Sequence, residues 1–142
     1  GDAVRVALAD TFALYLKTHN YHWNVEGADF YEYHKFFQKQ YEELWEAVDV
    51  LGEEIRSLNE YAPGSFSRFA ELSNIEDALT IPDGITMTAN LLADHEKVIQ
   101  TLRNAYELAE QAGAVGLANR LQDRIDAHFK HCWMLRSSLK NR

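Results

Sequence analysis

The chain has 142 residues and a mass of 16.3 kDa, enough for one domain with a buried core. Its formal net charge of −8 opposes general binding to DNA phosphates or anionic membranes, because like charges repel. A single cysteine, Cys132, excludes an internal disulfide and suits a reducing compartment, so we expect a cytoplasmic protein. We find no signal peptide and no apolar run long enough to span a membrane.

The first expected helix runs from about residue 2 to residue 25. Its apolar side chains recur at helical spacing: Val4, Leu8, Phe12 and Tyr15. Gly27 can adopt the left-handed conformation that ends a helix, and Asp29 is a suitable N-cap for the next one. We therefore expect a short turn between two long helices.

The second expected helix begins at Phe30 and ends near Asn59. Its apolar positions alternate in steps of four and three, which is typical of one continuous helical seam. The seam consists of Phe30, His34, Phe37, Tyr41, Leu44, Val48, Leu51 and Ile55. Nothing in this pattern indicates a break in the helix.

A long connection follows from Tyr61 to Gly84, too long for a tight turn between antiparallel neighbours. We expect it to carry a short helix over residues 66–72. A third long helix is expected over residues 85–111, and a last one after a connection bounded by Gly113 and Gly116. The inward positions are Leu92, His95, Val98 or Ile99, Leu102 and Tyr106 in the third helix, and Ala118, Leu121, Ile125, His128, Cys132, Leu135 and Leu139 in the last.

Two helices, a long crossover and two more helices predict an all-α, ferritin-like four-helix bundle that forms one domain over residues 1–142. Many bundles of this kind hold two irons between their own helices with Glu-x-x-His pairs. None of the six histidines here has Glu or Asp three residues before it. We therefore do not expect a di-iron centre built from such pairs within one chain.

A different set of side chains predicts a metal site between chains. Asp49 and Glu53 are four residues apart and so share one helix face. Asp49 is fifteen residues from His34, which is about 22 Å along an unbroken helix, whereas ligand bonds are about 2 Å. Two copies of this helix, antiparallel about a two-fold axis, would bring His34 of one copy to the carboxylates of the other, twice over.

These residues also carry a family resemblance. The stretch "KTHNYHWNVEGADFYEYHKFFQKQYEELWEAVDVLGEEI" is similar to the signature of the Dps family, the DNA-binding proteins from starved cells. The matching elements are His-Trp-Asn, a Gly, a Phe, a second His, and Asp-x-x-x-Glu fifteen residues later. The resemblance continues through "LLADHEKVIQTLRNAYELAEQAG" to "RIDAHFKHCWMLRSSL", and so covers nearly the whole chain.

The resemblance implies a hollow twelve-subunit shell that oxidises Fe(II), preferably with hydrogen peroxide, and stores the ferric product. It implies a ferroxidase whose inter-subunit centres hold iron, up to two ions per site, with zinc as a substitute. His22 and His34 would come from one subunit, and Asp49 and Glu53 from its neighbour. Trp23 would lie near the iron as a trap for oxidising equivalents. Imidazoles and carboxylates suit Fe(II), whereas a thiolate beside peroxide would be oxidised.

Two positions depart from the family pattern. Many relatives have a carboxylate four residues after the second histidine, where this chain has Gln38, so the second iron is expected to bind weakly or transiently. Relatives also line a three-fold pore with acids near the start of the last helix, where this chain has Asn119. The candidates to replace that charge are Glu110, Asp123 and Asp126.

The remaining histidines have simpler explanations. His95 and His128 are expected to be core residues, His131 has no assigned role, and His19 is expected to be structural. The alternatives to the ferroxidase are a non-catalytic shell that binds zinc or another divalent ion, and a shell that protects DNA. We do not expect DNA binding at neutral pH, because the chain is acidic and has no basic run.

Overall fold

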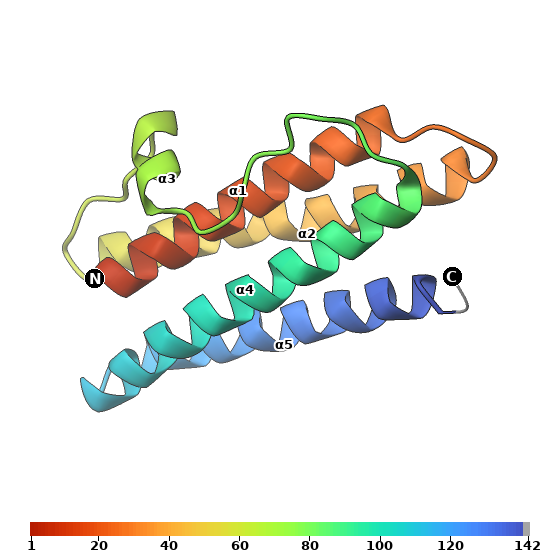
Figure 1. Cartoon of the computed structure of the whole chain (residues 1–142). Coiled ribbons are helices and arrows are strands. Elements are labelled where there is room, and N and C mark those ends of the chain that lie inside the picture. Colours follow the sequence, from red (N-terminus) through yellow and green to blue (C-terminus); the bar gives the residue numbers. More distant parts are fainter. Residues whose placement is uncertain (141–142) are drawn as a thin grey trace.

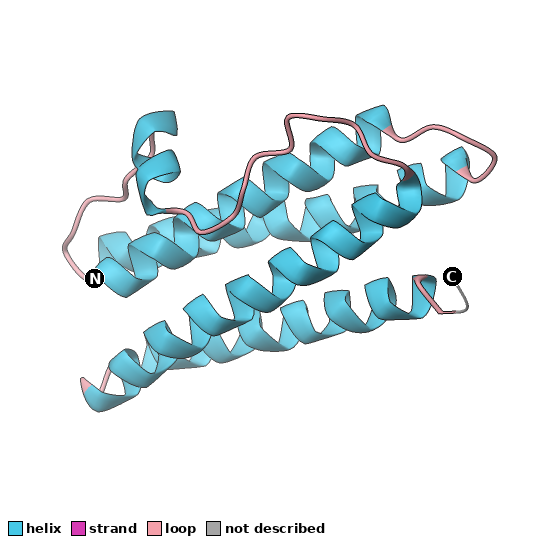
Figure 2. Cartoon of the chain, in the orientation of Figure 1, coloured by secondary structure: helices cyan, strands magenta, loops and turns pink. Residues whose placement is uncertain are grey.

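A computed structural model describes residues 1–140 as helices and connecting loops, with no strand in that range (Figure 2). The helices are α1 (Asp2–Asn24), α2 (Phe30–Ser57), α3 (Phe66–Leu72), α4 (Gly84–Gln111) and α5 (Val115–Ser138). Their order and bounds confirm the predicted four long helices and the short helix in the crossover. None of the helices in residues 1–140 combines the length and apolar character that a membrane crossing needs.

The four long helices form two antiparallel pairs, α1 with α2 and α4 with α5 (Figure 1). Helix α1 also packs on α4, whereas α2 and α5 approach one another at few points. Because α2 and α4 run in the same direction, the chain must travel the length of the bundle between them, and the crossover does so (Figure 1). This is the ferritin-like connectivity that the sequence predicts.

The core consists largely of the predicted seams, but Phe30, the first residue of the second seam, is exposed. Leu44, Leu51 and Ile55 of α2 are fully buried, as are Leu102 of α4 and Leu121 of α5. Leu14 of α1 is also fully buried, although the first predicted seam did not include it. Phe12 was predicted to face the core but is only half-buried, and its ring stacks on Phe69 of α3 at 4.8 Å between centroids.

One buried carboxylate anchors the crossover to the bundle. Asp10 of α1 accepts hydrogen bonds from Ser73 Oγ at 3.0 Å, from the Asn74 backbone N–H at 2.6 Å and from Thr101 Oγ1 at 2.7 Å. The carboxylate therefore joins α1, the crossover and α4. Asp83 then caps α4 by accepting from the Thr86 N–H at 2.8 Å.

Two predicted helix ends differ in detail from the structure. Asp29 stands at the N-cap of α2, but its side chain makes no capping hydrogen bond. The last helix begins at Val115, so Gly116 lies in its first turn rather than in the connection. Of the two glycines that were predicted to bound this connection, Gly113 has a left-handed backbone, with φ +71, and it lies in the turn after α4. Gly27 has φ +117, as the predicted turn before α2 requires.

Candidate metal centre

His22 and His34 lie face to face at the end of the α1–α2 pair. Their ring centroids are 3.7 Å apart with an interplanar angle of 17°. His22 Nδ1 donates to the His34 backbone carbonyl at 2.6 Å, and His34 Nδ1 donates to the His22 carbonyl at 2.8 Å. The two residues, twelve positions apart in sequence, thus fix one another through reciprocal hydrogen bonds.

These hydrogen bonds determine which ring nitrogens are free. A carbonyl oxygen only accepts, so each Nδ1 must carry its hydrogen. In a neutral imidazole the lone pair then lies on Nε2. The stacked rings of His22 and His34 therefore each present an Nε2 acceptor, and a backbone carbonyl sets the orientation of each ring, as is usual for imidazoles that bind metals.

The protonation state of His22 suits a ligand. Burial lowers the pKa of His22 below the ordinary value of 6.5, although the hydrogen bond to the His34 carbonyl and the Glu42 carboxylate act in the opposite direction. The side chain is only 7% exposed. At neutral pH the His22 ring is therefore neutral, which is the form that binds a metal.

The two predicted carboxylate ligands lie away from this pair. Helix α2 continues without interruption from residue 30 to residue 57, as predicted, so Asp49 and Glu53 are several turns from His34. Both carboxylates are exposed. One chain therefore brings His22 and His34 together but leaves Asp49 and Glu53 apart from them. The assignment of these four residues to one site stays a prediction that needs a second chain.

Gln38, one turn after His34, has a partner that the sequence did not indicate. Its Nε2 donates to Glu42 Oε1 at 2.7 Å, and the Glu42 carboxylate also raises the pKa of His22. The amide that replaces the usual acid thus binds a carboxylate one turn further along α2.

Aromatic side chains surround the histidine pair. His19 stacks on Tyr41 at 3.9 Å between centroids and lies 4.0 Å from the Trp23 ring. The Tyr15 hydroxyl and His19 Nδ1 share a hydrogen bond of 2.9 Å. These contacts support the expected structural role of His19. Trp23 itself is 60% exposed, beside His22 in the chain.

The other three histidines lie in the bundle core. His95 and His128 are completely buried, which confirms their prediction as core residues, and His131 is 7% exposed. Their hydrogen bonds to each other and to Glu43 and Arg124 were not predicted, because no spacing in the sequence reveals contacts between α2, α4 and α5. In residues 1–140, no three His, Cys, Asp or Glu side chains converge as metal ligands do.

Similar proteins agree with this fold. A low temperature-induced protein of Nostoc sp. is 36% identical over 135 residues, which cover 94% of this chain and 75% of the relative. A DNA protection during starvation protein of Brevibacillus brevis is 30% identical, with 94% of this chain and 89% of the relative covered. The crystal structure of a Dps protein from Vibrio cholerae O1 superposes with a TM-score of 0.94 at 30% identity, covering 97% of this chain and 87% of that one.

The Vibrio protein is described as a member of a broad superfamily of ferritin-like diiron-carboxylate proteins. The family model for the ferritin-like domain matches residues 2–142 of this chain. These matches confirm the resemblance based on the His-Trp-Asn and Asp-x-x-x-Glu elements. The chain therefore belongs to the ferritin-like proteins and, within them, to the Dps family.

Proposed function

We propose that this chain is an iron-storing ferroxidase. It oxidises Fe(II), with hydrogen peroxide as the preferred oxidant, at sites shared by two subunits of a hollow dodecamer that keeps the ferric product inside. One observation carries the proposal: His22 and His34 each present an oriented Nε2 acceptor, but among residues 1–140 no set of three or more His, Cys, Asp or Glu ligands forms around them. Asp49 and Glu53 of a second subunit would complete the ligand set at a two-fold interface.

Each residue type has a definite task in this reaction. The neutral imidazoles bind Fe(II), and the carboxylates favour the ferric product because added negative charge stabilises the more highly charged ion. When two Fe(II) ions are bound, peroxide takes one electron from each, and no hydroxyl radical is released. Gln38 contributes no negative charge, so the second Fe(II) would bind weakly.

Replacing Asp49 with Asn and Glu53 with Gln tests the proposal. These changes keep the side-chain size but remove the charge, and they should slow peroxide-driven Fe(II) oxidation by at least about tenfold. Glu46→Gln, another exposed carboxylate on α2, is the matched control and should oxidise iron at the unaltered rate. Full oxidation by the double variant, with ferric iron still eluting with the assembled particle, would refute the role of these carboxylates.

A second candidate is a shell whose inter-subunit site binds zinc or another divalent ion without catalysis. The observation that favours it is Gln38, whose amide donates to Glu42 where relatives have an acid. Peroxide consumption separates the two candidates. A ferroxidase consumes peroxide in proportion to the added Fe(II). A protein with a structural zinc site does not change the peroxide consumption that Fe(II) causes in its absence.

A further inference from the structure

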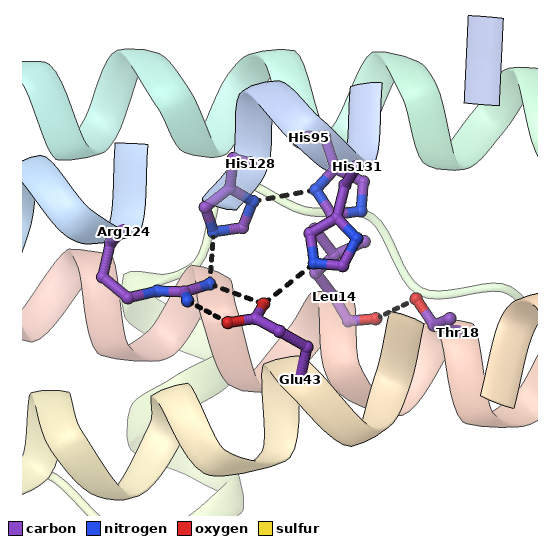
Figure 3. A network of polar contacts seen from close by, with 7 residues as sticks. All are labelled: Leu14, Thr18, Glu43, His95, Arg124, His128 and His131. Carbon is purple, nitrogen blue, oxygen red and sulfur yellow. Dashed lines mark hydrogen bonds and ion pairs between the residues drawn. The ribbon is translucent and has the colours of Figure 1, made fainter. Parts of the chain in front are cut away.

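A polar network crosses the bundle core between α2, α4 and α5, away from the His22–His34 pair (Figure 3). It consists of Glu43, His95, Arg124, His128 and His131. Arg124 forms an ion pair with Glu43 and is only 6% exposed, and His131 Nε2 donates to Glu43 Oε1 at 2.8 Å. Arg124 Nη2 also donates to His128 Nε2 at 3.0 Å. The proposed ferroxidase uses none of these five side chains.

The direction of the hydrogen bonds can be followed through the network. Arginine only donates, so His128 Nε2 must accept and His128 Nδ1 must carry the hydrogen. His128 Nδ1 then donates to His95 Nδ1 at 2.8 Å, which leaves the hydrogen of His95 on Nε2. That Nε2 is buried and has no hydrogen-bond partner. A buried N–H without a partner is rare in folded cores, because it loses its hydrogen bonds to water and gains none in return.

The spacing of the three rings matches that of imidazoles around a single ion. The centroids of His95 and His131 are 4.8 Å apart, those of His95 and His128 5.0 Å, and those of His128 and His131 6.0 Å. With metal–nitrogen bonds of about 2.0–2.1 Å and tetrahedral angles, imidazole centroids around one ion are roughly 5 Å apart. Three imidazoles and one carboxylate from three helices are also a ligand set that Zn(II), Co(II) and Fe(II) accept.

The charges of these groups suit a cation. Burial lowers the pKa of His95 and of His128 well below the ordinary value of 6.5, so both rings are neutral at pH 7. Burial alone would raise the pKa of Glu43, but hydrogen bonds from His131 and Arg124 hold it at about 2, so Glu43 is a carboxylate. Neutral imidazoles and a carboxylate are the protonation states in which these side chains bind metals.

The Arg124 guanidinium occupies the position that a metal ion would take. Its guanidinium contacts the lone pair of His128 Nε2 and both oxygens of Glu43, the atoms that a metal ion would use (Figure 3). With those atoms occupied, and with His95 and His128 hydrogen-bonded to one another, the lone pairs do not point at a common centre. The positive charge of Arg124 therefore balances the negative charge of Glu43 in place of a metal ion.

We propose that Glu43, His95, His128 and His131 form a latent site for one divalent transition-metal ion, and that Arg124 is its resident cation and keeps metal out of the bundle core. This inference does not depend on the ferroxidase proposal. It assigns Arg124 a role in specificity, since a chain without it would bind metal within the bundle as well as between subunits.

The side chain of Arg124 borders an open groove. Arg124 and Glu43 line a groove of about 400 Å³ between α2 and α5, together with Glu46 and Asp123. These two acids are exposed and do not belong to the network. The groove also gives a small cation a route to the network once the guanidinium is removed.

Cobalt(II) binding tests the proposal, because the ion suits the same ligands as zinc and absorbs visible light when bound. The background is the full-length chain with His22→Ala, His34→Ala, Asp49→Asn and Glu53→Gln, so that the inter-subunit ligands are absent. In this background Arg124→Leu and Arg124→Gln should each bind about one Co(II) per chain with a four-coordinate visible spectrum, whereas the unaltered Arg124 background should bind none. Adding His128→Leu should abolish the gained site.

Arg120→Leu is the matched control, because Arg120 lies one turn earlier on α5 and pairs with Glu54 outside the network. It should gain no Co(II). If the Arg124 variants unfold, Co(II) should restore their helical circular dichroism, since metal binding then drives folding. Two results would overturn the proposal: Arg124 variants that neither bind Co(II) nor regain helix with it, or a background with Arg124 intact that already binds one Co(II) through His128.

Discussion

Asp10 shows how much of the fold depends on one buried carboxylate. It accepts hydrogen bonds from the crossover and from Thr101 of α4, and its side chain is completely buried. Asp10→Ala should lower the free energy of unfolding by about 3 kcal/mol, because it leaves several buried donors without an acceptor. Urea denaturation at fixed chain concentration measures the change. Asp126→Ala, on an exposed face of α5, should alter stability by less than about 0.5 kcal/mol.

Trp23 is suited to react with stray oxidising equivalents. Its ring is 60% exposed, adjoins His22 in the chain and lies 4.0 Å from His19. After turnover with Fe(II) and excess peroxide, mass spectrometry should find oxidised Trp23 well before oxidised Trp133, which is similarly exposed but lies on α5 and does not adjoin His22. Equal oxidation of the two indoles would show that Trp23 is not close to the reacting iron.

At the level of the helices, the boundary between α2 and α5 is the side of the bundle where neighbouring helices make the fewest contacts. Polar contacts close it, chiefly those of Glu43 with Arg124 and His131, and of Glu54 with Arg120. The other three sides are closed mainly by apolar packing, although His95 and His128 also join α4 to α5 through a buried hydrogen bond. The response of the fold to acid should therefore originate in the polar network of Glu43, His95, Arg124, His128 and His131.

The free energy of unfolding should fall as the pH drops below about 6.5. Folded His95 and His128 have pKa values well below that of an unfolded histidine, so the unfolded chain binds protons first and gains stability relative to the folded one. A second loss should follow as the pH falls from 4.5 towards about 2, where Glu43 becomes protonated. Urea denaturation at pH 7.5, 6.0 and 5.0 measures the first loss. His128→Gln should make it smaller, and an unchanged pH dependence in that variant would contradict the explanation.

The sequence predicted the helices well because each seam is a local signal. Steps of three and four residues placed Leu44, Leu51 and Ile55 correctly in the core, and the length of the crossover predicted its path along the bundle. Gly116 misled the prediction because glycine is also tolerated in a first helical turn, whereas only Gly113 needs a left-handed backbone.

The candidate sites were harder to predict than the helices. The His-Trp-Asn element indicated His22 and His34, but their reciprocal hydrogen bonds to backbone carbonyls depend on the angle between α1 and α2. The core network was missed because a single histidine in an apolar stripe carries no sign of its partners on other helices. Glu43 could not be recognised either, since its contacts with Arg124 and His131 join residues more than eighty positions apart.

At the level of the whole molecule, the proposed metal site belongs to two chains. The most direct test mixes two inactive variants, one with His22→Ala and His34→Ala, the other with Asp49→Asn and Glu53→Gln. Shells reassembled from equal amounts of both should regain about a quarter of the wild-type rate of peroxide-driven Fe(II) oxidation, because in that fraction of sites intact histidines face intact carboxylates. A mixture no more active than its two parents would contradict a shared site.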